Sequence, residues 1–180
     1  MIRLFHIILY TIKGLLLKLS LRGSLRMNGV GRIAMSAKIT TSNNGSIELG
    51  QGVRVCAHAK LSADGGKLTI GENVGINPNM ILHCHGRITI GDGTLFAPNV
   101  CIYDHNHRFD ENGLAEGYSV GSIEIGRNCL IGVNVTILKN TKIGDGCVIG
   151  AGCVVSGEIP AHSVVSGNRE LIIRPIEPKS

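Results

Sequence analysis

Aliphatic residues recur at every sixth position from Ile125 to Val155, and a small or β-branched residue follows four positions later, as at Cys129 and Thr141. An amphipathic helix would repeat near 3.6 residues and a half-buried strand at two, so a period of six fits neither. Hexapeptide repeats indicate a parallel β-helix, in which each hexapeptide supplies one short strand and one corner. Three hexapeptides therefore close a coil of 18 residues.

A second repeat supports the coil. Near copies of one phrase end in glycine at Gly50, Gly71, Gly91 and Gly126, and a shorter copy ends at Gly144. These glycines are separated by 21, 20, 35 and 18 residues, so three of the gaps equal about one coil. The gap of 35 residues is one coil plus a loop, which we place at about 104–121. Long loops in compact repeats are uncommon and usually functional or disordered.

The length and composition fit one domain. Aromatic residues make up 3% of the 180 residues and there are 25 glycines, which suits a narrow coil with tight corners. We expect an apolar, helical N-terminal segment over 1–28, the β-helix over 29–168 and a C-terminal tail over 169–180. Solenoids need closed ends, so the two outer segments are the candidate caps.

The net charge and the cysteine spacing limit the classes of partner and the cellular compartment. The net charge is +5, but no basic stripe is interleaved with aromatics, so we expect no nucleic-acid partner. Three of the six cysteines, Cys129, Cys147 and Cys153, occupy the small inward position of the hexapeptide, and their spacing matches no paired zinc motif. We expect reduced, buried thiols and a cytoplasmic protein.

The N-terminal segment leaves two roles open. Its apolar stretches are interrupted by Arg3, Lys13 and Lys18 and are shorter than the roughly 20 residues that span a bilayer. No small-residue cleavage site follows, which argues against a secretory signal. The segment predicts either a helix that caps the coil or a basic amphipathic helix on the inner membrane surface.

Chemistry is expected where the rhythm breaks, at Tyr103-Asp-His-Asn-His-Arg108. Imidazole titrates near physiological pH, so His105 and His107 are candidates for a base, a proton donor or a metal ligand. Asp104 and Asp110 are candidates to orient one of the rings.

The chain resembles the hexapeptide-repeat acyltransferases, in particular the galactoside, maltose and nodulation-factor type of O-acetyltransferase. The resemblance runs from about Gly71 to Arg174 and rests on Ala97-Pro-Asn-Val100, the histidine loop, 125–132, 143–152 and Ser166-Gly-Asn168. Capsular and exopolysaccharide O-acetyltransferases are the subgroup most similar to the Asp-His-Asn-His phrase. The resemblance implies a left-handed coil, a homotrimer, and active sites in grooves between subunits.

The resemblance also implies residue roles. The catalytic histidine falls on His107, with His105 as the rival base. The acceptor-binding Asn falls on Asn77, and an acceptor-binding carboxylate falls on His85, a departure that puts the acceptor sugar in doubt. We add Tyr103 and Asp104 to the acceptor site. Acetyl-CoA is the implied donor, and its expected contacts are Gly132, Asn134, Gly150, Ala151, Ser156, Arg169 and Arg174.

The resulting hypothesis is an O-acetyltransferase that moves an acetyl group from acetyl-CoA to a sugar hydroxyl. The acceptor is a carbohydrate of the bacterial surface or its lipid-linked precursor. An N-acyltransferase acting on an amino sugar or nucleotide sugar is the first alternative.

Two rivals belong to other classes. Gamma-class carbonic anhydrases share the β-helix and bind zinc through three histidines across a subunit interface. Here we expect His83 and His85 to point to opposite faces of their strand, so that only His85 faces the groove and no metal is required. A nonenzymatic trimeric scaffold is the other rival, and a working pair of histidines at 105 and 107 argues against it.

Overall fold

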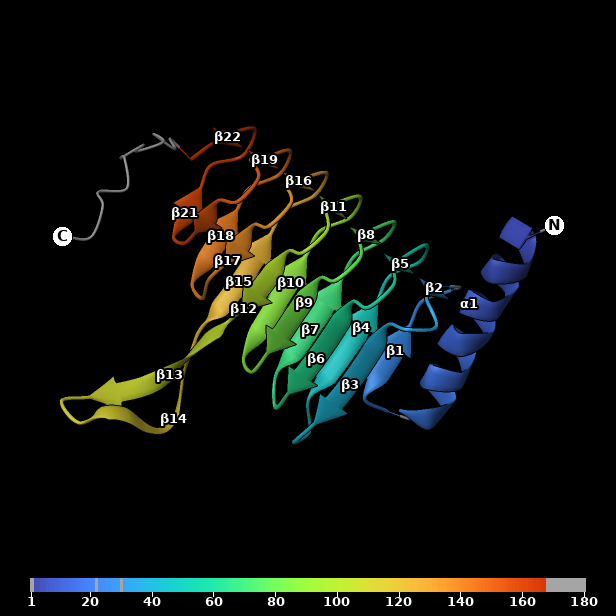
Figure 1. The fold of residues 1–180 in the computed structure, drawn as a ribbon, viewed down its shortest axis with the longest axis horizontal. Coiled ribbons are helices and arrows are strands. Elements are labelled where there is room, and N and C mark those ends of the chain that lie inside the picture. The colour runs from blue at the N-terminus through green and yellow to red at the C-terminus, as the bar shows by residue number, and fades with distance from the viewer. Residues whose placement is uncertain (1, 22, 30, 168–180) are drawn as a thin grey trace, which may run out of the picture.

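The computed structural model describes residues 2–21, 23–29 and 31–167, and for 2–6 the backbone only. Over these residues one helix, α1 (Ile2–Ser20), precedes 22 strands. Three parallel sheets wind into a solenoid, so the predicted left-handed parallel β-helix is confirmed (Figure 1). The expected tail, with Arg169 and Arg174, lies outside the described residues.

The chain visits the three sheets in turn, and each strand pairs with the one a coil earlier. Sheet A contains β1 (Leu25–Met27), β4 (Ser46–Leu49), β7 (Lys67–Ile70), β10 (Arg87–Ile90), β15 (Ser122–Ile125), β18 (Thr141–Ile143) and β21 (Glu158–Ile159). Sheet B contains β2 (Arg32–Ile33), β5 (Arg54–Val55), β8 (Gly75–Ile76), β11 (Leu95–Phe96), β16 (Leu130–Ile131), β19 (Val148–Ile149) and β22 (Val164–Val165). Sheet C contains β3 (Lys38–Ser42), β6 (Lys60–Asp64), β9 (Ile81–Cys84), β12 (Cys101–Tyr103), β17 (Thr136–Ile137) and β20 (Val154–Val155).

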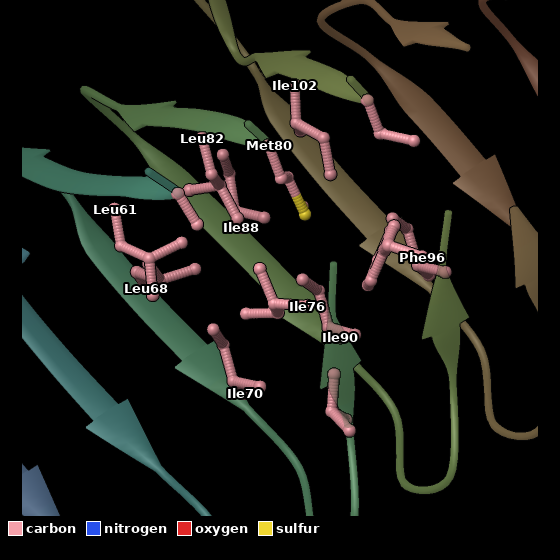
Figure 2. Close-up of a cluster of buried hydrophobic side chains, with 14 of the residues drawn as sticks. Leu61, Leu68, Ile70, Ile76, Met80, Leu82, Ile88, Ile90, Phe96 and Ile102 are labelled. Atoms are coloured by element: carbon pink, nitrogen blue, oxygen red, sulfur yellow. The ribbon is translucent and has the colours of Figure 1, made fainter. Parts of the chain in front are cut away.

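The aliphatic residue of each hexapeptide points into the coil. Ile88 and Ile90 pair in register with Leu68 and Ile70 of the previous coil, and all four are buried. Figure 2 shows these side chains stacked with Phe96, the largest fully buried residue. Burying each such side chain contributes roughly 1.5–3 kcal/mol. The period of six is therefore the period of the core.

Asparagine turns the corner between sheets B and C. Asn79, Asn99 and Asn134 have φ values of 62°, 61° and 57°. Asn tolerates this left-handed conformation better than most residues with a side chain. These residues stack from coil to coil, since Asn99 N donates to Pro78 O and Asn134 N donates to Pro98 O.

Helix α1 covers the first coil. The Nζ atom of Lys13 donates to the carbonyls of Ala34, Met35 and Ala37, at 2.9, 2.6 and 2.6 Å. Strand β1 begins this coil at Leu25, before the boundary expected at residue 29, because Leu25 already pairs with Ile47 of β4. The outward face of the helix is apolar, with Ile12, Leu15 and Leu19 between 46% and 62% exposed. The helix is not long and apolar enough over its described residues to cross a membrane.

The cysteines follow the expected pattern. All six are free thiols, and Cys129, Cys147 and Cys153 are buried in the coil. Burial raises the pKa of the Cys129 thiol. These thiols therefore pack as small apolar groups.

Candidate active site

The histidine loop is a two-stranded hairpin, β13 (His105–Asp110) and β14 (Gly113–Val120), that projects from the side of the coil (Figure 1). It leaves at the corner between sheets C and A, after β12, and returns to β15. The backbone N–H of Gly121 donates to the Asp104 carbonyl at 2.7 Å and closes the neck of the hairpin. The coil above and below keeps its register, because β10 pairs directly with β15.

Asp104 lies fully buried at this neck. Its two carboxylate oxygens accept hydrogen bonds from the backbone N–H groups of His85 and Gly86, at 2.8 and 2.7 Å. The Nδ1 atom of His105 lies 3.1 Å from Oδ1 of the same carboxylate. A carboxylate that accepts a bond from Nδ1–H fixes the tautomer and leaves Nε2 with its lone pair. Asp104 therefore orients His105, as one of the two candidates considered from the sequence.

Three histidines gather beside Asp104. The ring centroids of His83 and His85 are 4.7 Å apart, those of His83 and His105 are 5.0 Å apart, and those of His85 and His105 are 4.0 Å apart. The prediction that His83 and His85 point to opposite faces is wrong. Side chains at i and i+2 of a strand share a face, and it is neighbouring residues that alternate. Leu82 and Cys84 accordingly point into the core.

His107 occupies a different environment from His105. It is exposed on β13, opposite Tyr118 of β14, and the centroids of these two rings are 4.7 Å apart. His107 also lines a hollow on the hairpin together with Arg108 and Lys139. Lys139 reaches the hairpin from the next coil, where its Nζ atom donates to the Ser119 hydroxyl at 2.5 Å. His107 is thus open to a ligand, while His105 is 9% exposed.

Burial shifts the titration of several groups in the cluster. Burial is the largest cause that lowers the pKa of His83, and the neighbouring His85 lowers it further. Burial likewise lowers the pKa of His85, followed by the effect of His105. Burial raises the pKa of the Tyr103 hydroxyl. His83 and His85 are therefore neutral, and able to accept a proton or bind a cation, at neutral pH.

Most of the expected donor-binding residues lie at a different corner. Gly132 and Asn134 follow β16, and Gly150 and Ala151 follow β19, all at the corner between sheets B and C. The two stretches stack, since Gly132 N donates to Ile149 O and Gly152 N donates to Val133 O, at 2.8 and 2.7 Å. A Cβ added to Gly132 would come within 2.7 Å of Ala151 N. Glycine is needed there by the stacking of the coils themselves.

The structure brings together some of the predicted residues and separates others. The residues joined around the hairpin neck are His85, Tyr103, Asp104, His105 and His107. Asn77 lies directly after β8, at the corner between sheets B and C and on the other side of β9 from His85, and its Oδ1 atom is 3.7 Å from the Cys56 Sγ. Ser156 lies one residue beyond the end of β20, at the corner between sheets C and A.

The sequence did not place His83 and Tyr118 in the cluster of rings around Asp104. His83 carried a signal in the phrase His83-Cys-His85, whose i, i+2 spacing places both rings on one face. Tyr118 carried none, because its ring reaches His85 and His105 only through the pairing of β14 with β13, with centroids 4.6 and 5.1 Å away. Such a pairing depends on the hairpin register, which a loop without repeats does not reveal.

Comparison with known sequences points to one kind of repeat. Residues 122–157 match the profile of the bacterial transferase hexapeptide (six repeats). The chain is 40% identical over 114 residues to a Staphylococcus aureus (strain Mu50) protein named an acetyltransferase, covering 63% of this chain and 57% of that protein. It is 31% identical over 131 residues to the "Probable acetyltransferase Rv3034c" of Mycobacterium tuberculosis, covering 71% and 44%. The chain thus spans about half the length of these relatives.

Solved structures share the fold. The N-acyltransferase AntD from Bacillus cereus, in complex with dTDP and 3-hydroxybutyryl-CoA, superposes with a TM-score of 0.70 at 24% identity, covering 84% of this chain and 81% of that chain. PerB from Caulobacter crescentus, in complex with CoA and GDP-perosamine, superposes with a TM-score of 0.57 at 22% identity, covering 76% and 54%. At these identities the agreement concerns the coil.

Proposed function

We propose that this chain, whose residues 122–157 match the profile of the bacterial transferase hexapeptide, is an acetyl-CoA-dependent O-acetyltransferase whose acceptor is a sugar hydroxyl. The observation that carries the proposal is the hairpin neck, where titratable rings, a buried carboxylate and an exposed histidine lie at a break in an otherwise regular wall. The relatives named acetyltransferases support the choice of acyl group.

In this proposal His107 is the general base. Its neutral ring removes the proton of the acceptor hydroxyl while the hydroxyl oxygen forms a bond to the thioester carbonyl carbon. The carbon–sulfur bond then breaks, and the imidazolium returns the proton to the thiolate of the departing CoA. A positioned base contributes typically about 10²–10⁴-fold. Backbone N–H groups along the groove stabilise the oxyanion.

His105 is the rival base, and the geometry gives it one advantage. Asp104 holds its ring, which is the arrangement that orients a histidine for proton transfer. His107 has the advantage of access, because it lies exposed in the hollow beside Lys139. Separate His105→Ala and His107→Ala variants decide between the two.

The proposal includes a homotrimer, which the separation of the two halves of the proposed site supports. The histidines lie where sheet C ends, and Gly132, Asn134, Gly150 and Ala151 lie where sheet C begins. Within one chain these two halves lie at opposite edges of sheet C. We therefore place the histidine edge of one subunit against the donor edge of its neighbour, with three grooves in the closed trimer.

The apolar face of α1 supports a membrane-bound acceptor. Apolar side chains of α1 remain exposed, while Lys13 is used to close the coil. Beside the helix, a cavity of about 660 Å³ is lined by apolar residues and by Arg32 and Arg54. An amphipathic helix with such a face binds the membrane interface. We place the protein peripherally on the inner membrane, with a lipid-linked oligosaccharide or polysaccharide precursor as acceptor.

The experiment has two stages. Calorimetric titration with acetyl-CoA is expected to show saturable binding near one per subunit, and its absence in a folded trimer would overturn the proposal. Transfer of radiolabelled acetyl to bacterial glycan extracts then identifies the acceptor. An ester product is released by mild base and an amide is not, so a base-stable product would favour N-acylation of an amino sugar. Retention of the protein in solution with liposomes would contradict the membrane placement.

A further inference from the structure

The three histidines beside the hairpin neck have the composition of a metal centre. Each of His83, His85 and His105 offers one ring nitrogen, and these three nitrogen atoms all lie within 4.8 Å of one another. We propose that these residues bind one divalent transition-metal ion, with zinc as the best match. This inference concerns a site within one chain and does not depend on the acetyl-transfer proposal.

The first argument is an orphaned atom. The Nε2 atom of His85 is buried and has no hydrogen-bond partner among the described residues. Buried polar atoms are nearly always satisfied, so an unsatisfied one requires an explanation such as an ion. This nitrogen belongs to the ring that packs closest to His105, with centroids 4.0 Å apart. A metal ion between the rings would give the orphaned atom its partner.

The second argument is the support around the ligands. Metal-binding histidines usually donate their other ring N–H to a carboxylate, which fixes the ring and makes it a stronger ligand. Asp104 is placed to do this for His105, at 3.1 Å from its Nδ1 atom, which leaves Nε2 as the nitrogen available to a metal ion. Asp104 is itself held by the backbone N–H groups of His85 and Gly86. One buried carboxylate therefore fixes two ligand-bearing segments.

The third argument is charge. The facing titratable groups are Asp104, Asp64, Tyr103, Tyr118 and His107. Asp64 is close enough to interact electrostatically with His83 and His85, and it accepts hydrogen bonds from Ser42 and Asn43. Two carboxylates beside three imidazole rings favour a cation at this position. Nitrogen ligands without a carboxylate in direct reach suit zinc better than magnesium or calcium.

The geometry allows an open site. Zinc binds imidazole nitrogen at about 2.0–2.1 Å, so tetrahedral ligand atoms lie about 3.4 Å apart. Binding would draw the three nitrogen atoms inward from their present separations of up to 4.8 Å. Three protein ligands leave a fourth position for water or an acceptor hydroxyl. A bound ion would occupy the lone pair of His105, and proton removal would then rest with His107.

The test uses the full chain, stripped of metal with a chelator and returned to chelator-free buffer. Titration with Zn²⁺, followed by calorimetry, is expected to give one ion per chain. Titration with Co²⁺ is expected to give the intense visible absorption of a four-coordinate nitrogen-bound ion. Absence of saturable binding by the folded protein would overturn the proposal, as would a weak six-coordinate Co²⁺ spectrum.

Variants assign the ligands. His83→Asn and His85→Asn are each expected to weaken Zn²⁺ binding by more than the roughly 10- to 100-fold that loss of an outer partner costs. His58→Asn and His162→Asn are matched controls, since both residues are exposed and have φ near 60°, which Asn tolerates. Equal losses in the controls, or unchanged affinity in the cluster variants, would contradict the assignment. Thermal unfolding of each metal-free variant verifies that it is folded.

Discussion

The two edges of sheet C differ in the residues that form them. At the edge shared with sheet B, corners of Asn, Pro and Gly stack from coil to coil and present mainly backbone and short side chains. At the edge shared with sheet A, the hairpin interrupts the stack, and His83, His85 and His105 gather around a buried carboxylate. In the proposed function, the repeat supplies a regular surface along which acetyl-CoA lies, and the interruption supplies the groups that react with it.

The largest expected effect comes from the histidine edge. His107→Ala should lower turnover by about 10²–10⁴-fold, because the base is lost, while acetyl-CoA affinity stays nearly unchanged. Steady-state kinetics with the identified acceptor and calorimetry with the donor measure the two quantities. His105→Ala is the matched variant on the same strand. Full turnover in His107→Ala with a large loss in His105→Ala would transfer the role of base.

The next effect belongs to the donor edge. Ala151 is exposed, so Ala151→Trp should block the close approach of the donor and weaken acetyl-CoA binding at least about tenfold, or about 1.4 kcal/mol. Gly150 is a less specific target, since a Cβ there would lie 3.0 Å from the Val165 carbonyl oxygen and disturb the coil.

The control for this edge is Ala161→Trp, which places the same side chain on an exposed alanine just beyond β21, at the corner between sheets A and B. It should leave donor affinity unchanged. Comparable losses in both variants would show that the donor does not follow the edge between sheets B and C.

A smaller effect is expected in the first coil, at the corner between sheets B and C. The carbonyls of Ala34, Met35 and Ala37 have no earlier coil to accept from, and Lys13 donates to all three. Lys13→Met should lower the free energy of unfolding by about 1 kcal/mol, which is less than the roughly 1.5–3 kcal/mol of hydrogen bonds to charged groups because the ammonium is only partly buried. Urea denaturation measures it, with the exposed Lys60→Met as control. An equal loss in Lys60→Met would mean that Lys13 does not close the coil.

The smallest effect concerns pH. Burial lowers the pKa of His83 and His85, so the folded state binds fewer protons there than the unfolded state. Stability from this source is present above the ordinary histidine pKa of about 6.5 and falls as the pH drops below it. Melting temperatures of the metal-free protein between pH 8 and 5 should show the decline, and His83→Asn should flatten it. A decline of the same slope in that variant would place its origin elsewhere.

The sequence predicted the coil far better than the site. Every sixth residue from Ile125 to Val155 is buried, because spacing alone specifies which side chains a coil must cover. The early coils carry weaker repeats, and β1 at Leu25 was placed outside the coil for that reason. The i, i+2 spacing of His83 and His85 is also enough to place both rings on one face of β9, and the prediction of opposite faces applied the alternation rule wrongly.

The rest of the site depends on contacts that spacing does not encode. Asp104 reads as one more loop carboxylate, yet it is buried because the neck of the hairpin encloses it and two backbone N–H groups bind it. Tyr118 and Lys139 reach the site from the far strand of the hairpin and from the next coil. The apolar pattern of residues 1–28 predicts either a cap or a membrane helix, whereas α1 covers the coil with one face and exposes an apolar face with the other.

The bond from Gly121 N to the Asp104 carbonyl joins the two ends of the hairpin at a single point on the wall. The hairpin inserted between these residues leaves β12 paired with β9 and β15 paired with β10. The solenoid therefore does not depend on the outer part of the hairpin for its register. Substituting residues 108–117 as one block, which retains the proposed base His107 together with Tyr118 and Ser119, offers a route to new acceptor specificity that leaves the solenoid untouched.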